Sequence, residues 1–422
     1  MPLSRRHLIG SGIVLGTALS SSSSAHASPL AQPPAPSARL SPLTWAPRNR
    51  LLLQKLIADY GNNSQRYNPL RRPYAVFDWD NTCIAGDCEE TLLQYVASRF
   101  LFALAPQEFA QATALDVPER PLDPSCVTIK GAPVSFAALH ADLVSDYTEL
   151  SSRTAPIQPD DPALLSLKSK LQFAYDAIVA TYAAEVSCRW IVRLFSGHSY
   201  EQLVTLARTS NLWHLGQGIA QEQWITPPQR PGQSGIVAGS ILTGLRLCPE
   251  IADLQATLRL HGIDVFICSA SLEEIVSVFA TDPTFGYALP RENILGIRMD
   301  WPQGRLGPRP SGNWPITVRE GKVRALRAAI ANERGYGPVL VCGDSSGDCA
   351  MMTAFEATRH ALIINRCLGG DIGGLSAKAA EQIGTPQPRF LLQGRDDTIG
   401  EWRPSEEAIP FGAATPRLLA KT

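Results

Sequence analysis

The sequence of 422 residues lacks three features that would assign it to common classes of protein. Its formal net charge is only -1, so it offers no basic excess for binding a nucleic acid. Its nine cysteines include no CxxC pair, which argues against a zinc site and leaves their pairing open. No apolar run reaches the roughly 20 residues that cross a bilayer. We therefore expect neither a nucleic-acid partner nor a stable membrane anchor.

The N-terminus is typical of a targeting segment. Arg5 and Arg6 precede a mildly apolar stretch over residues 9–19, and a serine tract then leads to a small-residue site at Ala27. This pattern predicts a signal peptide, residues 1–27, and an exported protein that is periplasmic or secreted. The paired arginines favour the twin-arginine route, with the general secretory route as the alternative.

The chain as a whole is apolar enough to bury a large core, at 45% hydrophobic and 18% charged residues. Residues 28–48, rich in Pro, Ala and Ser, are expected to form a flexible leader. Residues 49–103 and 244–422 alternate strand-like and helical patterns, which predicts an α/β core with a parallel sheet covered on both faces. Residues 104–243 are mainly helical and predict a helical insert.

Two helix starts within the insert have local signals. Asp161 precedes Pro162, and Ser199 with Gln202 makes a capping box.

Two carboxylates directly follow the first strand-like run. Residues 74–77 are apolar and end in the motif DWDNT, which begins at Asp78 and contains Asp80. At the end of a parallel strand, one carboxylate can attack phosphorus while the other handles protons, if a metal and positive donors screen the substrate. The alternative is an EF-hand calcium loop. It is disfavoured because Cys83 stands where such a loop needs glycine, and because a strand precedes the motif instead of a helix.

A second acidic motif, GDSSGD, follows another apolar strand. Its carboxylates, Asp344 and Asp348, come without histidine or cysteine, and such hard oxygen ligands suit Mg²⁺. Taken alone, the motif could also be a turn with a helix cap. Ser269, at a strand end, and Lys322, at a helix start, would complete a cradle for phosphoryl oxygens. Each of these two residues also has a purely structural alternative. The serine of this segment that matters could be Ser271, as the cap of the next helix, and Lys322 could be an ordinary surface lysine.

In chain order, the four motifs DWDNT, SAS, Lys322 and GDSSGD resemble the signature set of the haloacid dehalogenase superfamily. The resemblance implies a Rossmann-like core, a cap domain inserted between the first and second motifs, a phosphoaspartyl intermediate and one Mg²⁺. It implies that Asp78 is the nucleophile and that Asp80 acts as general acid and then general base. The implied metal site contains Asp78, Asp80 through its backbone carbonyl, Asp344 and Asp348, and the implied phosphate-binding residues are Thr82, Ser269 and Lys322.

Sequence outside the motifs is similar to the bacterial secreted phosphorylcholine phosphatases, in the segments YAVFDWDNT, GDCEETLL, GLRLCPEIADL, SASLEEIVSVFATDP, FGYALPRENILGI and FLLQGRD. This resemblance implies a small phosphate monoester as substrate, with phosphocholine as the candidate. A trimethylammonium group needs aromatic faces and a nearby carboxylate. The candidates are Trp79, Glu89 and Glu90, together with Trp190, Trp213 and Trp224 of the insert. Two positions depart from the resemblance: SAS stands where SAA is expected, and Trp79 replaces a smaller apolar residue.

Two other classes of function stay open. A phosphotransferase would pass the phosphoryl group from the same intermediate to an alcohol instead of water. A noncatalytic envelope binding protein could also use this fold, although it would not need both aspartates of DWDNT. The sequence therefore favours a Mg²⁺-dependent phosphomonoester hydrolase.

Overall fold

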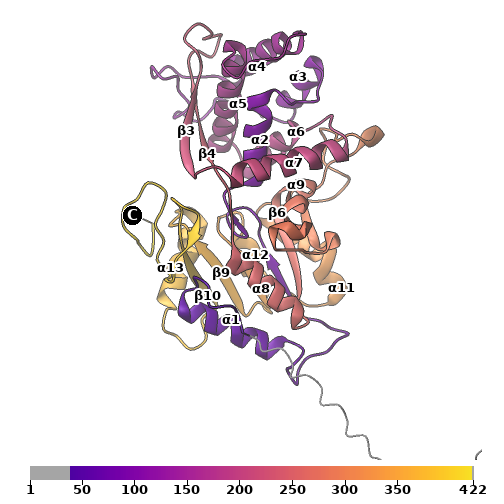
Figure 1. Ribbon diagram of the computed structural model, residues 1–422, viewed down its shortest axis with the longest axis vertical. Coiled ribbons are helices and arrows are strands. Elements are labelled where there is room, and N and C mark those ends of the chain that lie inside the picture. The colour runs from indigo at the N-terminus through magenta and orange to yellow at the C-terminus, as the bar shows by residue number, and fades with distance from the viewer. Residues whose placement is uncertain (1–38, 421–422) are drawn as a thin grey trace, which may run out of the picture. The chain divides into compact units, whose positions relative to one another are not determined.

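The computed structural model describes residues 39–420 (Figure 1), so the predicted signal peptide and most of the predicted leader lie outside the described residues. Residues 39–48, which we expected in the flexible leader, are instead anchored at Leu40 and Trp45, whose large apolar side chains are buried in the core cluster, while most residues around them are exposed. In the described part of the chain, no helix is both long and apolar enough to cross a membrane.

The centre of the fold is a seven-stranded sheet in the order β11-β10-β9-β8-β1-β6-β7. All neighbouring strands run parallel except the edge pair β10 and β11. The predicted α/β fold with a mostly parallel sheet is confirmed. The strands are β1 (Tyr74–Phe77), β6 (Asp264–Leu272), β7 (Ile294–Ile297), β8 (Leu340–Gly343), β9 (His360–Asn365), β10 (Phe390–Asp396) and β11 (Glu401–Trp402).

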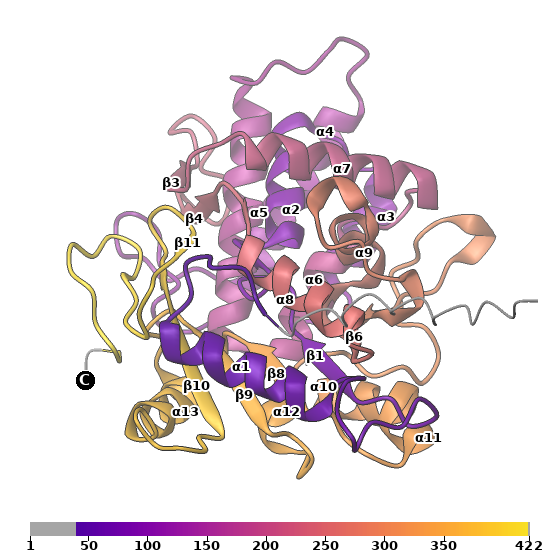
Figure 2. The same cartoon turned by 60° about the horizontal axis from the view of Figure 1, so that its bottom comes forward.

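Helices cover both faces of this sheet. Side chains of β1 alternate between two apolar clusters, with Phe77 in one and Val76 in the other. The first cluster includes α1 (Pro47–Tyr60) and α8 (Pro249–Leu260), and Figure 2 shows α1 lying across β8, β9 and β10. The second includes α10 (Glu320–Leu326), α12 (Cys349–Thr353) and α13 (Gly370–Glu381). The remaining helices of this part are α9 (Glu273–Thr281) and α11 (Asn332–Arg334), the latter reached from α10 through a π-helical turn.

The insert lies within the chain between β1 and β6, after α2 (Cys88–Arg99) and before α8. Its helices are α3 (Pro106–Ala114), α4 (Phe136–Ser151), α5 (Pro162–Thr181), α6 (Ala184–Arg193) and α7 (Tyr200–Leu215). It also contains an antiparallel hairpin of β3 (Ala220–Ile225) and β4 (Ala238–Thr243), which the helical pattern did not predict. A short pair, β2 (Ile84–Ala85) and β5 (Arg246–Leu247), joins the chain before the insert to the chain after it.

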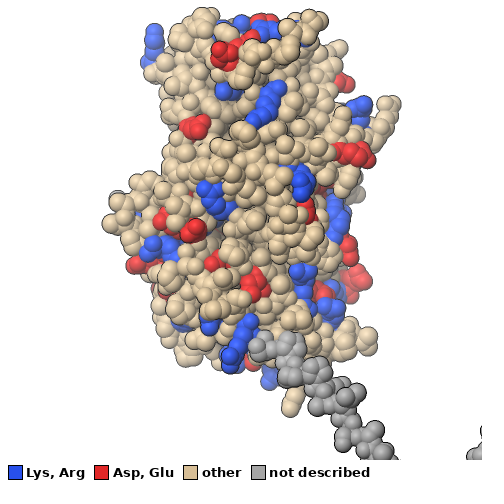
Figure 3. Space-filling view, viewed as in Figure 1, with Lys and Arg blue, Asp and Glu red and all other residues tan. Residues whose placement is uncertain are grey.

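One helix crosses the boundary that we expected between core and insert. α2 (Cys88–Arg99) follows the first motif, yet it packs against α5, α6 and α7 of the insert (Figure 1). The domain limits 49–103, 104–243 and 244–422 stay a prediction. Because α2 starts beside the DWDNT turn, the insert is tied to the carboxyl end of β1. Figure 3 shows acidic and basic side chains interspersed over the visible face.

Candidate active site

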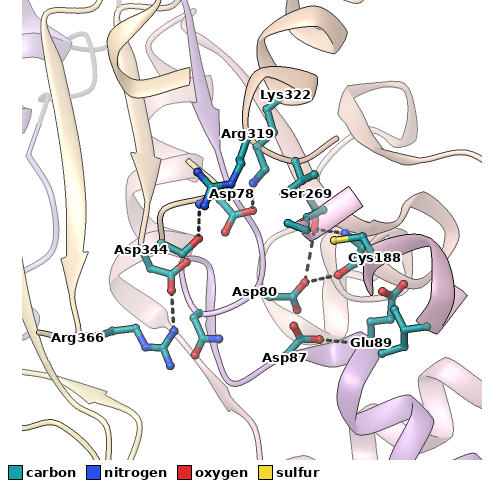
Figure 4. A pocket seen from close by; sticks show the side chains of 18 of the residues that line it. Asp78, Asp80, Asp87, Glu89, Cys188, Ser269, Arg319, Lys322, Asp344 and Arg366 are labelled. Atoms are coloured by element: carbon teal, nitrogen blue, oxygen red, sulfur yellow. Dashed lines mark hydrogen bonds and ion pairs between the residues drawn. The ribbon is translucent and has the colours of Figure 1, made fainter. Parts of the chain in front are cut away.

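A cavity of about 300 Å³ opens at the carboxyl ends of β1, β6 and β8. Parallel register places these three strand ends side by side, with β1 between β6 and β8. Such an end of a parallel sheet is where α/β proteins bind ligands. The cavity brings together residues from all four motifs and from the insert (Figure 4): Asp78, Asp80, Asp87, Glu89, Tyr175, Cys188, Ser269, Ser271, Arg319, Lys322, Asp344 and Arg366.

Asp78 and Lys322 form a buried ion pair. The Lys322 ammonium lies 2.5 Å from Asp78 Oδ1 and 2.7 Å from Asp348 Oδ1, and its side chain is only 2% exposed. Burial raises the pKa of Asp78, the nearby Asp348 carboxylate raises it further, and Lys322 lowers it. Burial would lower the pKa of Lys322, but Asp348 and Asp78 raise it above its ordinary value. A cationic Lys322 is therefore fixed beside Asp78, so the surface-lysine alternative does not hold.

Three carboxylates could hold a metal ion. Oxygen atoms of Asp78, Asp344 and Asp348 lie within 4.8 Å of one another, and all three residues are buried. Both oxygens of Asp348 are already engaged, Oδ1 by Lys322 and Oδ2 by the backbone N–H groups of Asp344 and Ser345. Asp78 and Asp344 each have one oxygen whose side-chain partner is only the Thr82 hydroxyl, at the long distances of 3.4 and 3.3 Å, so these two carboxylates are better able to offer an oxygen directly, while Asp348 holds the GDSSGD turn. An all-oxygen set with few carboxylates fits Mg²⁺, which binds through one or two carboxylates and substrate oxygens.

Asp80 lies on the other side of the cavity from this cluster and is clamped at both oxygens (Figure 4). Its Oδ1 accepts a hydrogen bond of 2.8 Å from the Cys88 backbone N–H, and its Oδ2 accepts one of 2.7 Å from the Ser271 hydroxyl. Ser269 Oγ is farther from Oδ2, at 3.5 Å. Burial raises the pKa of Asp80, and the two shorter hydrogen bonds lower it. The side chain of Asp80 is not part of the carboxylate cluster, which leaves its backbone carbonyl as the predicted metal contact.

Two residues of the DWDNT motif do not line the cavity. Thr82 is buried, and its hydroxyl lies 3.4 Å from Asp78 Oδ2 and 3.3 Å from Asp344 Oδ1, so it bridges two carboxylates instead of facing a phosphate. Trp79 is fully buried, with its ring 5.0 Å from that of Tyr287. In the turn after β1 the two aspartates face the cavity and Trp79 faces the core. The geometry therefore does not support the expected ligand contacts of Thr82 and Trp79.

Of the two predicted glutamates, one lines the cavity and one lies behind it. Glu89 Oε1 accepts a hydrogen bond of 2.7 Å from the Leu272 backbone N–H, and burial raises the pKa of Glu89 well above its ordinary range. Glu90 accepts a hydrogen bond of 3.1 Å from the Tyr175 hydroxyl, and Tyr175 itself lines the cavity. Asp87 also lines the cavity and caps α2 through bonds to the N–H groups of Glu89 and Glu90. This acidic end adjoins Asp80.

The tryptophans of the insert lie elsewhere. Trp190 is fully buried and donates from its ring N–H to the Thr113 carbonyl at 2.8 Å. Trp213 is about half exposed and lies against the guanidinium of Arg99. Trp224 lies against the Lys168 ammonium, 4.9 Å from the ring centre. None of the three lines the cavity, where the aromatic ring of the insert comes from Tyr175.

Sequence reasoning missed several residues of the cavity. Arg366, just after β9, donates to Asp344 Oδ2 at 2.8 Å and so adds a second cation to the carboxylate cluster. Asp87 had a usable signal, because an aspartate before Cys-Glu-Glu is typical of a helix N-cap. Tyr175 and Cys188 had none, since an aromatic or a thiol in a helical insert gives no sign of which face it presents.

Three comparisons show which known proteins this chain is similar to. The family of haloacid dehalogenase-like hydrolases matches residues 230–353, which include Ser269, Lys322 and Asp344. A phosphorylcholine phosphatase of Pseudomonas aeruginosa is 24% identical over 301 residues, which cover 66% of this chain and 70% of that protein. A crystal structure of a conserved protein of unknown function from Anaerococcus prevotii is 30% identical with a TM-score of 0.81, over 88% of this chain and 98% of that chain. Residues 230–353 therefore contain a haloacid dehalogenase-like hydrolase domain, and the cavity gathers its site residues with the two aspartates of DWDNT.

Proposed function

We propose that this enzyme is an exported, Mg²⁺-dependent phosphomonoesterase that forms a phosphoaspartyl intermediate on Asp78. The observation that carries the proposal is that the two aspartates of the DWDNT turn have different surroundings. Asp78 faces the Lys322 ammonium and the carboxylate cluster, whereas Asp80 faces the opposite, acidic end of the cavity. A noncatalytic binding site would gain nothing from a second carboxylate held at both oxygens.

In the proposed reaction, each residue of the site has its own role. Asp78 attacks phosphorus, and Ser269 and Lys322 bind the oxygens of the transferred group. Asp80 gives a proton to the departing alcohol oxygen and later takes one from the water that hydrolyses the phosphoaspartate. When bound, Mg²⁺ would be held by Asp78, Asp344 and the Asp80 backbone carbonyl, and would offset the negative charge of the phosphoryl oxygens.

The acidic end of the cavity supports a leaving alcohol that carries a positive charge. Asp87 and Glu89 line it, and Glu90 lies behind Tyr175, whose ring offers an aromatic face. A quaternary ammonium group is attracted to such a face and to nearby carboxylates. This chemistry and the similarity to a phosphorylcholine phosphatase support phosphocholine as the candidate substrate.

The test is phosphate release from p-nitrophenyl phosphate and phosphocholine by residues 28–422, with Mg²⁺ or with a chelator. Asp78→Asn should lower kcat by about a thousandfold, roughly 4 kcal/mol of barrier. The matched control is Asp59→Asn, an exposed aspartate on α1, which should leave the rate unchanged. A preference for phosphocholine supports the whole proposal, and cleavage of the generic ester alone leaves the mechanism but not the substrate. Undiminished activity of Asp78→Asn would refute the nucleophile, and transfer to added alcohols in place of hydrolysis would point to a phosphotransferase.

A further inference from the structure

The second motif differs from its expected form at Ser271, and the structure gives this residue an unforeseen place. In the sequence, Ser271 is the alternative candidate to cap the helix that follows. Instead α9 has Leu272 at its N-cap position, with no side-chain capping bond. Strand β6 continues through the motif, and its register against β7 shifts between Cys268 and Leu272. The Ser271 hydroxyl is thereby free of the helix and lies against Asp80.

The contact between Ser271 and Asp80 is short and sheltered. The two oxygen atoms lie 2.7 Å apart, and Ser271 is 5% exposed. Within residues 39–420, the only other side chain bonded to the same carboxylate oxygen is Ser269, at 3.5 Å. Ser269 Oγ also accepts the Ser271 backbone N–H at 3.1 Å, and its own contact with Asp80, at 3.5 Å, is longer than the 2.7 Å of Ser271. Ser271 is therefore the main partner of Asp80 Oδ2.

The two ends of the Asp80 carboxyl group are held by different parts of the chain. Oδ1 is held by the backbone N–H of Cys88, the first residue of α2, and Oδ2 is held by a strand residue almost two hundred positions away. The last torsion of an aspartate side chain is broad and has no sharp staggered minima. One hydrogen bond would let the group swing about that torsion, and the second fixes its plane. The proton of a carboxyl group lies in this plane, so the alcohol oxygen of a substrate must also lie near it to receive the proton.

We propose that Ser271 is a positioning residue for Asp80, holding its carboxyl group toward the leaving oxygen of the substrate. The inference rests on the proposed function. A hydroxyl both donates and accepts hydrogen bonds, so Ser271 keeps its contact whether Asp80 carries the proton or has given it up. A backbone N–H can only donate, so Cys88 holds Oδ1 as the acceptor while the proton is carried by or released from Oδ2.

The experiment compares leaving groups. An alkyl phosphate needs a proton on its departing oxygen, whereas p-nitrophenolate leaves without one. Ser271→Ala should lower kcat/KM for ethyl phosphate by about tenfold to a hundredfold, the range expected for loss of a hydrogen bond to a charged group. It should change kcat/KM for p-nitrophenyl phosphate by less than about threefold, because p-nitrophenolate leaves without a proton. A merely structural defect would instead lower kcat/KM for both esters alike. Ser271→Thr keeps the hydroxyl and should restore most of the rate on ethyl phosphate.

The matched control is Ser277→Ala on α9, whose buried hydroxyl bonds the Glu273 carbonyl and does not contact Asp80. It should leave the ratio of the two esters unchanged. Equal losses on both esters with Ser271→Ala, or no loss on either, would overturn the inference while the proposed function stands. If the wild-type protein cleaves neither ester, the proposed function fails first and the inference falls with it. Should Ser271→Ala not fold, Ser271→Cys carries the same comparison, because a thiol fills the space but is a weak hydrogen-bond donor.

Discussion

Replacing Lys322 by methionine tests how the acidic cluster is held together. Methionine has a similar length and no charge. It would leave Asp78 and Asp348, 2.5 and 2.7 Å from the ammonium in the wild type, without their shared cation. Removing one partner of a buried ion pair costs about 3–5 kcal/mol, a large part of the roughly 5–15 kcal/mol that stabilises a typical protein. We expect Lys322→Met to be strongly destabilised in the presence of a chelator.

A divalent cation should restore part of that loss. In the wild type, three carboxylates face two cations, Lys322 and Arg366. Without Lys322 the cluster is more negative and attracts Mg²⁺ more strongly, and a ligand that binds only the folded state stabilises it. The urea midpoint of the variant should therefore rise more with Mg²⁺ than that of the wild type. Activity should still be lost, since no ammonium remains to bind the phosphoryl oxygens.

The measurement is urea unfolding with and without Mg²⁺, with Lys378→Met as the control on the exposed side of α13. This control should differ little from the wild type, because an exposed charge contributes little to stability. A loss below about 1 kcal/mol in Lys322→Met would contradict the account of a buried ion pair. A loss that Mg²⁺ leaves unchanged would show that the three carboxylates do not form the metal site.

Two further predictions concern the acidic end of the cavity. Burial raises the pKa of Glu89 above its ordinary 4.5, so the folded protein holds a proton that the unfolded chain has released. The stability contributed by this group is fully present below its ordinary pKa of 4.5 and is lost as the pH rises through the raised pKa. Glu89→Gln should remove that part of the fall in urea midpoints above pH 4.5, and an unchanged slope would contradict it. Tyr175→Leu removes the aromatic face of the cavity and should lower kcat/KM for phosphocholine by about 3- to 30-fold. Tyr175→Phe keeps the ring and should keep most of the rate. An equal loss of kcat/KM on p-nitrophenyl phosphate would argue against a cation–π contact.

Features that depend on neighbouring residues were predictable from the sequence. Asp161 accepts from the N–H of Ala163 and caps α5, as its position before a proline predicts. Ser199 and Gln202 form the expected capping box of α7. The apolar run that ends at Asp78 is β1, and its place in a parallel sheet brings Asp78 and Asp344 to one edge. In each case the local hydrogen bonding or the strand pattern is fixed by the sequence itself.

Features that depend on packing were not predictable. Ser271 has the sequence of a helix cap, but the register shift in β6 aims its hydroxyl at Asp80 instead. Trp79 is a residue type that often contacts ligands, yet the turn that aims Asp78 and Asp80 at the cavity directs the Trp79 side chain into the core. The hairpin β3–β4 lies within a region of helical pattern. The direction of a side chain at a strand end depends on tertiary register, which periodicity does not encode.

In the proposed mechanism, one end of the cavity carries out the phosphoryl transfer and the other end selects the leaving alcohol. At the phosphate end, cations from α10 and from the segment after β9 offset carboxylates that follow β1 and β8, so the whole arrangement belongs to the sheet and its helices. At the other end, the carboxylates of Asp87 and Glu89 come from α2, and the ring of Tyr175 comes from α5. Because α2 packs against the insert yet starts beside the DWDNT turn, a change in the insert would move this acidic wall without moving Asp78. A cationic alcohol would favour the charged forms of these carboxylates and would be held next to Asp80, which is the proposed proton donor to its oxygen.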